Sequence, residues 1–206
     1  MDALATVADT DRLFVQQRFA PLANRYTIST VGPDGQSPGE FLCRVQQKRM
    51  KIREQITFYA DEAQQVPVLQ LKARRVLEFR GVTDVLLPHG QPIGTLRKLF
   101  GKSLLRSTWE VQDPGGNVVA TAEESSLFIA ILRRVWGRLP IVGDLPFLLP
   151  FHFDIAAPSG QQLGTYRRIW GIRDRYLLDL TPDPQRSLDR RIMMAFTVAL
   201  DALQDR

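Results

Sequence analysis

Cysteine and histidine are scarce in this chain of 206 residues, which has one cysteine, Cys43, and two histidines. A single cysteine cannot form an internal disulfide, which is typical of proteins from a reducing compartment. We therefore expect a cytoplasmic protein. The sequence also has no acidic loop with the oxygen-ligand spacing that calcium needs. Neither a metal site nor a cofactor is predicted.

Several catalytic and targeting motifs are missing as well. The sequence contains no GxSxG, no GxxxxGK[ST], no HExxH and no CxxC. The N-terminal residues MDALATVADTD are acidic and lack the apolar segment of a secretory signal. We therefore predict that the chain is not an enzyme and expect no secretory signal.

Basic residues are in excess, since the net charge is +5 and the sequence pI is about 9.7. Most of them are arginine, which offers planar, two-pronged contacts to phosphate. Such a surface attracts nucleic acid, acidic lipid headgroups or phosphorylated ligands. A genome that favours arginine codons produces the same composition, so both interpretations stay open.

Short segments rich in β-branched and aromatic residues begin at Arg12 and are separated by Gly, Pro and Asp. Several alternate with the period of two that half-buried strands require. The predicted strands are 13–17, 26–31, 40–47, 55–59, 68–73, 82–87, 92–98, 108–112, 118–123, 151–156, 162–168 and 176–180. Regularly spaced short strands predict a mainly β fold, a meandering barrel or a sandwich, rather than a parallel α/β sheet.

A weak internal repeat supports antiparallel hairpins. Residues 88–98 read PHGQPIGTLRK, 158–168 read PSGQQLGTYRR and 114–124 read PGGNVVATAEE, with a related PDGQSPGEF at 33–41. Each begins with a turn whose Gly is predicted to supply the positive φ of a hairpin. The second small residue, Gly94, Ala120 or Gly164, is predicted to allow a bend or a close backbone approach.

The stretch 188–204, LDRRIMMAFTVALDALQ, predicts a buried helix. From Ile192 to Leu200 only Thr197 is polar. A helix that is apolar all round must be covered on every side. It is too short to span a bilayer, which needs about 20 apolar residues. We therefore predict that the rest of the chain wraps around this helix.

A second, amphipathic helix is predicted near 125–138, SSLFIAILRRVWGR, with Ser125 or Ser126 as its N-cap. Its basic and aromatic residues make it a candidate for contact with a membrane surface. The candidate residues are Arg133, Arg134, Trp136 and Arg138. The alternative is that this helix simply closes one end of the fold with its apolar face.

Four stretches together resemble a known family: NRYTIS from Asn24, ITFYADEAQQVPVLQLKAR from Ile56, HGQPIGTLRKLFGKSLLRSTWEVQD from His89, and SLDRRIMMAFTVALD near the C-terminal end. The sequence resembles the LURP-one-related proteins of the tubby C-terminal-like superfamily, which includes the phospholipid scramblases. The resemblance implies a closed antiparallel barrel of about twelve strands, threaded by the C-terminal helix. On this interpretation 12–206 is one barrel domain, and 1–11 is a flexible segment without periodic pattern.

The resemblance also implies a candidate ligand site. Tubby domains bind phosphoinositide headgroups through Lys-x-Arg after a Gly at the start of a barrel strand. The matching residues here are Gly94 to Arg97, with Thr95 in place of the Lys. The candidate residues for an anionic headgroup are Arg97, Lys98, Lys102 and Arg106. Strand alternation places Lys98 on the opposite face from Arg97. The calcium segment, cysteine cluster and membrane helix of scramblases are missing, which argues against lipid scrambling.

The leading functional hypothesis is a non-enzymatic binding or scaffold module that recognises anionic phospholipid headgroups or another acidic partner. An alternative is an enzyme or small-ligand carrier with a barrel-end pocket near His152 and Asp154. Nucleic acid is a third, less favoured partner, because adjacent basic residues on a strand face opposite sides. Arg190 and Arg191 are predicted to pair with carboxylates such as Asp183 or Asp189.

Overall fold

The computed structural model describes residues 3–18, 24–48, 55–74, 81–99, 107–125, 152–169 and 174–203. Two helices, α1 (Ala3–Ala8) and α3 (Arg190–Leu203), flank a set of strands in the chain. The strands are β1 (Arg12–Arg18), β2 (Arg25–Val31), β3 (Pro38–Lys48), β4 (Gln55–Tyr59), β5 (Pro67–Ala73), β6 (Val82–Leu86), β7 (Pro92–Leu99), β8 (Thr108–Gln112), β9 (Val118–Glu124), β10 (His152–Ala156), β11 (Gln162–Ile169) and β12 (Arg175–Asp179).

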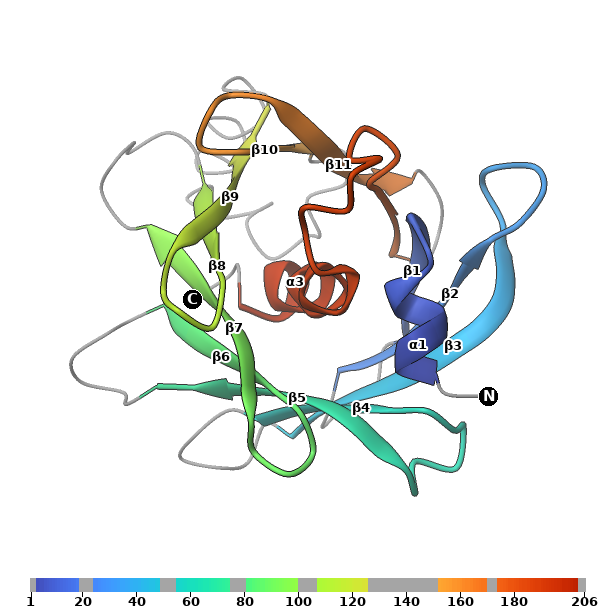
Figure 1. The fold of residues 1–206 in the computed structure, drawn as a ribbon. Coiled ribbons are helices and arrows are strands. Elements are labelled where there is room, and N and C mark those ends of the chain that lie inside the picture. The colour runs from blue at the N-terminus through green and yellow to red at the C-terminus, as the bar shows by residue number, and fades with distance from the viewer. Residues whose placement is uncertain are drawn as a thin grey trace, which may run out of the picture.

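The strands form one closed antiparallel barrel in which each strand pairs with its neighbours in the sequence (Figure 1). The barrel closes where β1 pairs with β12, with Leu13 opposite Leu178. Closure leaves no strand edge unpaired, which is the usual way that all-β folds avoid edge-to-edge association. The predicted mainly β barrel of about twelve strands is therefore confirmed, and the sandwich alternative is wrong.

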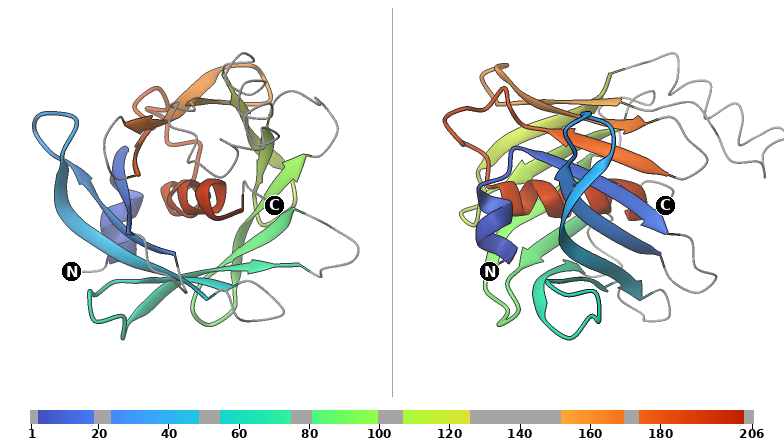
Figure 2. Two further views of the ribbon diagram at one scale, coloured as in Figure 1. Left: turned by 180° about the vertical axis from the view of Figure 1, so that it is seen from behind. Right: turned by 90° about the vertical axis from the view of Figure 1, so that its right-hand side faces the viewer.

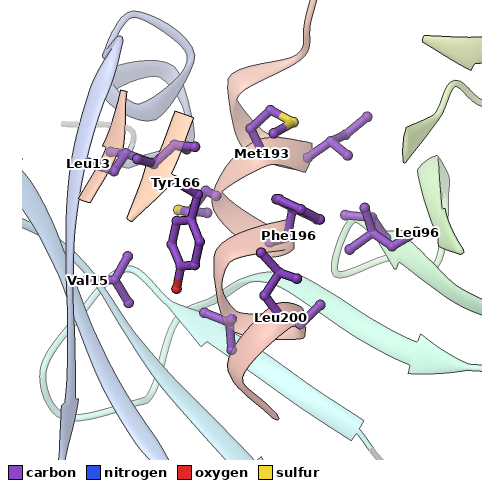
Figure 3. Close-up of a cluster of buried hydrophobic side chains, with 14 of the residues drawn as sticks. Leu13, Val15, Leu96, Tyr166, Met193, Phe196 and Leu200 are labelled. Atoms are coloured by element: carbon purple, nitrogen blue, oxygen red, sulfur yellow. The ribbon is translucent and has the colours of Figure 1, made fainter. Parts of the chain in front are cut away.

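Helix α3 runs through the middle of the barrel, as predicted (Figures 1 and 3). Every residue from Met193 to Leu200 is inaccessible to solvent. Phe196 meets the edge of the Trp109 ring with their centroids 6.3 Å apart. The polar exception, Thr197, satisfies its hydroxyl by donating to the backbone oxygen of Met194 at 2.7 Å. Among the residues that the structure describes, no helix has the length and apolar character needed to cross a membrane.

The repeated turns have the predicted glycine geometry. Gly35, Gly90, Gly116 and Gly160 have φ values of 71°, 90°, 84° and 87°. In the hairpins β6–β7, β8–β9 and β10–β11 the second strand carries one extra residue, at Ile93, Val119 and Leu163. Each of these bulges immediately precedes the second small residue of the repeat. The repeat is therefore a structural device that bends the strands around the helix.

The second small residue of the repeat lies against other parts of the chain. A Cβ atom at Gly94 would lie 2.6 Å from Cδ1 of Ile192, which is in α3. One at Gly164 would lie 2.5 Å from the backbone oxygen of Asp179, on the neighbouring strand β12. The predicted close approach is confirmed at both glycines, whereas Ala120 is accommodated at the equivalent place.

The two ends of the barrel differ in how the strands are connected. At one end, which we call the turn end, the hairpins close through short turns such as 87–91, 113–117 and 157–161. α1 and the start of α3 lie at this end too (Figure 2). At the other end, the loop end, the connections are 19–23, 49–54, 75–80, 100–106, 126–151 and 170–173, all outside the described residues.

The N-terminal segment differs from the prediction of a flexible stretch over 1–11. Ala3–Ala8 form α1, whose Val7 is 1% exposed and belongs to the hydrophobic core. The missed signal is short: one buried valine in six residues is too little for a periodicity to show. The amphipathic helix predicted near 125–138 falls outside the described residues, apart from Ser125.

Candidate functional site

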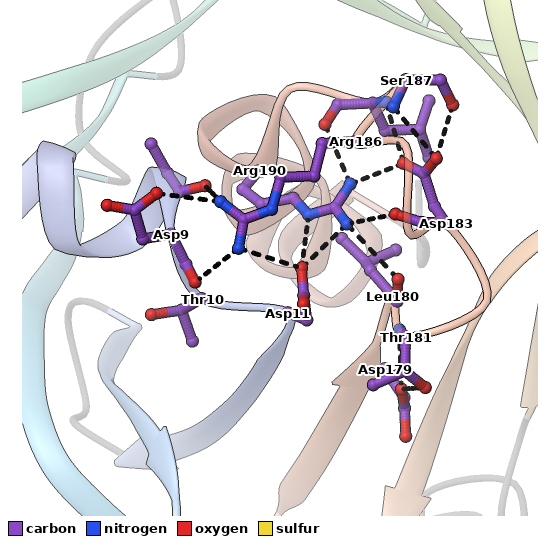
Figure 4. Close-up of polar contacts among 12 residues, drawn as sticks. Asp9, Thr10, Asp11, Asp179, Leu180, Thr181, Asp183, Arg186, Ser187 and Arg190 are labelled. Atoms are coloured by element: carbon purple, nitrogen blue, oxygen red, sulfur yellow. Dashed lines mark hydrogen bonds and ion pairs between the residues drawn. The ribbon is translucent and has the colours of Figure 1, made fainter.

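Basic side chains at the turn end are held by carboxylates. Arg190, whose side chain is 1% exposed, donates to Asp183 at 2.6 Å and to Asp11 at 2.8 Å (Figure 4). It also donates to the backbone oxygens of Asp183 and Leu188. This guanidinium joins the start of α3 to the segment between α1 and β1, so its role is structural. The predicted pairing of Arg190 with Asp183 is confirmed.

Burial alone raises the pKa of the Asp183 carboxyl. The hydrogen bond from Arg190 and those from the backbone N–H groups of Leu188 and Ser187 outweigh that effect. The net result is a pKa below the ordinary value, so Asp183 stays ionised in its buried position.

Other arginines of this end have acidic partners as well. Arg186 contacts Asp9 at 2.8 Å, and its backbone has a φ of 53°. Arg191 contacts Asp189 at 2.6 Å, as predicted. Further pairs are Arg12 with Asp179 at 3.3 Å, and Arg44 with Glu62 at 3.3 Å. Each of these arginines therefore has a carboxylate partner within the fold.

The interior at the loop end contains a cluster of tyrosines around the last turns of α3. The hydroxyls of Tyr26 and Tyr176 both donate to Asp201, at 2.6 and 2.5 Å. Tyr166 stacks on Tyr176 and donates to the backbone oxygen of Thr197. Burial, and then the charge of Asp201, raise the pKa of Tyr176, so its hydroxyl keeps its proton. The cluster fixes the C-terminal part of α3 to three strands.

Beyond this cluster the barrel interior becomes polar. Near the loop end, the odd-numbered strands point polar side chains inward. These include Gln17, Gln47, Lys98, Glu124 and Arg168. Gln47 accepts from the side chain of Asn24 at 2.9 Å, and Arg168 pairs with Asp174. The Lys98 ammonium lies 5.8 Å from the centre of the Trp109 ring. The interior thus changes from apolar to polar toward this end.

The structure separates two of the predicted headgroup ligands. Arg97 points outward from β7 and is exposed, whereas Lys98 faces the interior above Trp109. The prediction that these two side chains lie on opposite faces of the strand is confirmed, so they do not form a single site. The other predicted residues lie outside the described part of the chain. They are Lys102, Arg106, Arg133, Arg134, Trp136 and Arg138.

Exposed arginines gather at the loop end of the strands. β1 ends at Arg18 and β2 begins at Arg25, while Arg97 and Arg167 lie two residues before the ends of β7 and β11. All four side chains point outward and are exposed. Within the described part of the chain none of these four makes an ion pair. Sequence reasoning missed Arg18 and Arg25. The sequence did contain a signal for them, because both are basic residues at the ends of the two strands that flank 19–23.

The alternative site near His152 does not line the barrel. His152 and Asp154 lie on the outer face of β10, with Nε2 and Oδ1 3.3 Å apart and side chains 40% and 50% exposed. The inward-facing residues of this strand are Phe153 and Ile155, which are fully buried. No group of three His, Cys, Asp or Glu side chains in the described residues is arranged to hold a metal ion.

These features define a helix-threaded, closed antiparallel β-barrel. Its turn end holds arginines paired with carboxylates, and its loop end combines two such pairs, Arg74 with Asp84 and Arg168 with Asp174, with the four exposed arginines. The sequence model of the LURP-one-related family matches residues 42–201, from β3 to α3. The chain therefore belongs to the LURP-one-related family, within the tubby C-terminal-like superfamily. A comparison with curated proteins finds no significant match.

Proposed function

We propose that the chain is a non-enzymatic binding module whose loop end contacts an anionic phospholipid surface. The observation that carries the proposal is the uneven neutralisation of arginine. At the turn end Arg12, Arg186, Arg190 and Arg191 each have a carboxylate partner. At the loop end Arg74 and Arg168 pair with Asp84 and Asp174, but Arg18, Arg25, Arg97 and Arg167 are exposed, and within the described residues none of these four forms an ion pair.

The sequence of the connections at the loop end supports the same proposal. They carry many of the basic residues of the chain: Arg49, Lys51, Arg53, Arg75, Arg80, Lys102, Arg106, Arg133, Arg134, Arg138 and Arg173. Acidic residues there are few, namely Glu54, Glu78 and Asp144. Each basic residue near a membrane surface contributes on the order of 1 kcal/mol of attraction to an anionic leaflet.

The residues proposed from the sequence lie in, or next to, these connections in the chain. Arg97 and Lys98 are near the end of β7, and Lys102 and Arg106 are in the connection that follows. Arg133, Arg134, Trp136 and Arg138 belong to the connection between β9 and β10, which combines basic with apolar residues. That combination is typical of peripheral membrane contact. We place the protein at the cytoplasmic face of a membrane, where anionic lipids are enriched.

Co-sedimentation with vesicles tests this proposal. We expect binding to phosphatidylserine-containing vesicles at low salt, little binding to pure phosphatidylcholine, and loss of binding as salt screens the charges. Arg97→Gln with Arg167→Gln is expected to weaken binding about thirtyfold, from roughly 1 kcal/mol for each charge near the surface.

A matched control changes the net charge equally at the opposite end. Gln36→Glu with Gln161→Glu alters two exposed residues of the turn end. This variant is expected to bind vesicles like the unchanged protein. Equal weakening by both variants would mean that only net charge matters, and absence of vesicle binding would refute the proposal. Salt-sensitive binding to duplex DNA in place of vesicles would point to the nucleic-acid alternative.

A further inference from the structure

Three arginines from three neighbouring strands share one area of the outer surface at the loop end. They are Arg18 of β1, Arg25 of β2 and Arg175 of β12, which we call the arginine patch. We propose that the arginine patch binds a phosphate monoester. The inference rests on the proposed function in that it specifies which anion this end of the barrel recognises.

Strand register brings the three side chains together. Arg18 and Arg25 are directly opposite each other in the β1–β2 pair. Arg175 is opposite Gln16, which is two residues before Arg18 on β1. Residues opposite each other in such a pair have Cβ atoms about 5 Å apart, and diagonal neighbours stay within reach of long side chains. All three alternate with the inward-facing Gln17, Tyr26 and Tyr176, so they point outward. Arg18 and Arg25 are exposed, whereas Arg175 is half-buried and its Nε is shielded from solvent.

No carboxylate of the described residues neutralises the patch. The outward neighbours are Gln16, Thr27 and Gln46, which are neutral. Asp174 adjoins Arg175 in sequence, but its carboxylate binds Arg168. Arg168 lies opposite the inward-facing Tyr176, so this ion pair is on the inner side of the sheet, away from the patch. Like charges placed directly opposite each other in a sheet are destabilising, so a bound anion would relieve the repulsion between Arg18 and Arg25.

Arg97, on β7 at the opposite side of the barrel, provides a contrast. It also lies near the loop end of its strand and points outward, but its cross-strand neighbour on β8 is Glu110. A carboxylate opposite an arginine lowers the local positive potential and competes with an external anion. The arginine patch has no such competitor among its register neighbours, which makes it the stronger anion site.

The chemistry of guanidinium favours phosphate over other anions. Its planar fork donates two parallel hydrogen bonds, which match two oxygens of one phosphate group. A phosphate monoester carries nearly two negative charges near neutral pH and three terminal oxygens. A diester in a lipid headgroup has one charge and two such oxygens. Several arginines around one anion therefore select for the monoester.

Vesicles that differ only in the phosphate test the selectivity. The full chain is titrated with phosphatidylcholine vesicles containing either phosphatidic acid, a monoester, or phosphatidylglycerol, a diester. We expect tighter binding to phosphatidic acid at equal surface charge. The variant Arg18→Lys with Arg25→Lys keeps both charges but loses the planar fork. Its preference for phosphatidic acid is expected to fall by about tenfold, since a charge-assisted hydrogen bond contributes roughly 1.5–3 kcal/mol.

The outcomes separate this inference from the proposed function. Binding to both anionic vesicles without a preference, or a preference that survives in the lysine variant, overturns the phosphate site alone. Binding to neither refutes the proposed function as well. An unchanged melting temperature of the lysine variant shows that a lost preference does not reflect unfolding.

A soluble probe distinguishes the source of the phosphate. Glycerol 3-phosphate is titrated while the NMR signals of the arginine side chains are followed. Shifts in the unchanged protein that vanish in the lysine variant identify a soluble monoester as a sufficient ligand. Selectivity seen with vesicles but not with glycerol 3-phosphate identifies the lipid headgroup, and no response to either monoester refutes the site.

Discussion

The two ends of the barrel use the same residue type for opposite purposes. At the turn end Arg190 is almost completely buried and contacts Asp11 and Asp183. At the loop end Arg18 and Arg25 are exposed and lie opposite each other. The difference teaches that the role of an arginine here is set by its carboxylate neighbours in space. Composition alone does not reveal it.

The interior follows the same division. Toward the turn end and in its middle, α3 packs against apolar side chains such as Leu13 and Leu96 (Figure 3). Toward the loop end it meets tyrosine hydroxyls that donate to Asp201. One end is therefore specialised for stability. The proposed binding surface occupies the other, where fewer contacts constrain the outward side chains.

The largest expected effect comes from removing the central arginine of the turn end. Arg190→Ala leaves Asp183 buried without its charged partner. Breaking a buried ion pair in this way costs about 3–5 kcal/mol. Urea unfolding, followed by labelling of the buried thiol of Cys43, measures the change in the free energy of unfolding. Arg97→Ala at the loop end is the control and is expected to stay within about 0.5 kcal/mol. Equal effects at both ends would abolish the distinction between them.

A smaller effect is expected from filling the close approach at Gly164. The Cβ of Gly164→Ala would collide with the backbone oxygen of Asp179, so β11 and β12 must separate locally. Overpacking of this kind costs about 1–3 kcal/mol. Thermal unfolding monitored by circular dichroism checks this, with the exposed neighbour Gln162→Ala as a control. A melting temperature unaffected by Gly164→Ala would mean that β11 and β12 can separate at this position without loss of stability.

Acid is expected to weaken the turn end selectively. The pKa values of Asp183 and Asp189 lie below their ordinary values because hydrogen bonds from Arg190 and Arg191 outweigh the effect of burial. A lowered pKa in the folded state stabilises the fold above the unfolded pKa of about 3.9. That stability is lost as the pH falls below this value.

The free energy of unfolding measured from pH 7 to pH 3 should therefore decline at the acid end. Asp183→Asn should lower it at pH 7 and leave a smaller difference from the unchanged protein at pH 3. A constant difference across this range would show that the Asp183 charge is not what stabilises the turn end.

The smallest effect on stability is expected at the arginine patch. Arg18→Gln with Arg25→Gln removes the repulsion between two directly opposed charges. Relief of such a pair stabilises a sheet by roughly 0.2–1 kcal/mol. Chemical unfolding at low and high salt measures it, and the gain should shrink as salt screens the charges. A clear loss of stability would assign these arginines to the fold instead of a ligand.

Most of the fold was predictable because its signals are local and repeated. Period-two alternation located the strands, and the glycines at 35, 90, 116 and 160 located the turns. The apolar run around Phe196 required an enclosing shell. The closed order of the strands was less accessible, since pairing of β1 with β12 joins residues at opposite ends of the chain. It came from the family resemblance.

The candidate site was only partly predictable for a related physical reason. Sequence reasoning considered basic residues that are adjacent in the chain, such as Arg97 and Lys98, which strand alternation places on opposite faces. Arg18 and Arg25 are neighbours only across two strands, so their proximity depends on register. Pairing of Arg190 and Arg191 with carboxylates was predictable, because those carboxylates are within a few residues.

The pairing of β1 with β12 has a consequence for how the protein is made. Leu13 emerges from the ribosome long before its partner Leu178, and α3 follows later still. Contacts between such distant segments are slow to form, which lowers the folding rate. Until α3 is synthesised, the growing sheet has neither its seam nor its core. Nascent chains of this protein are therefore expected to depend on chaperones until the last helix has been added.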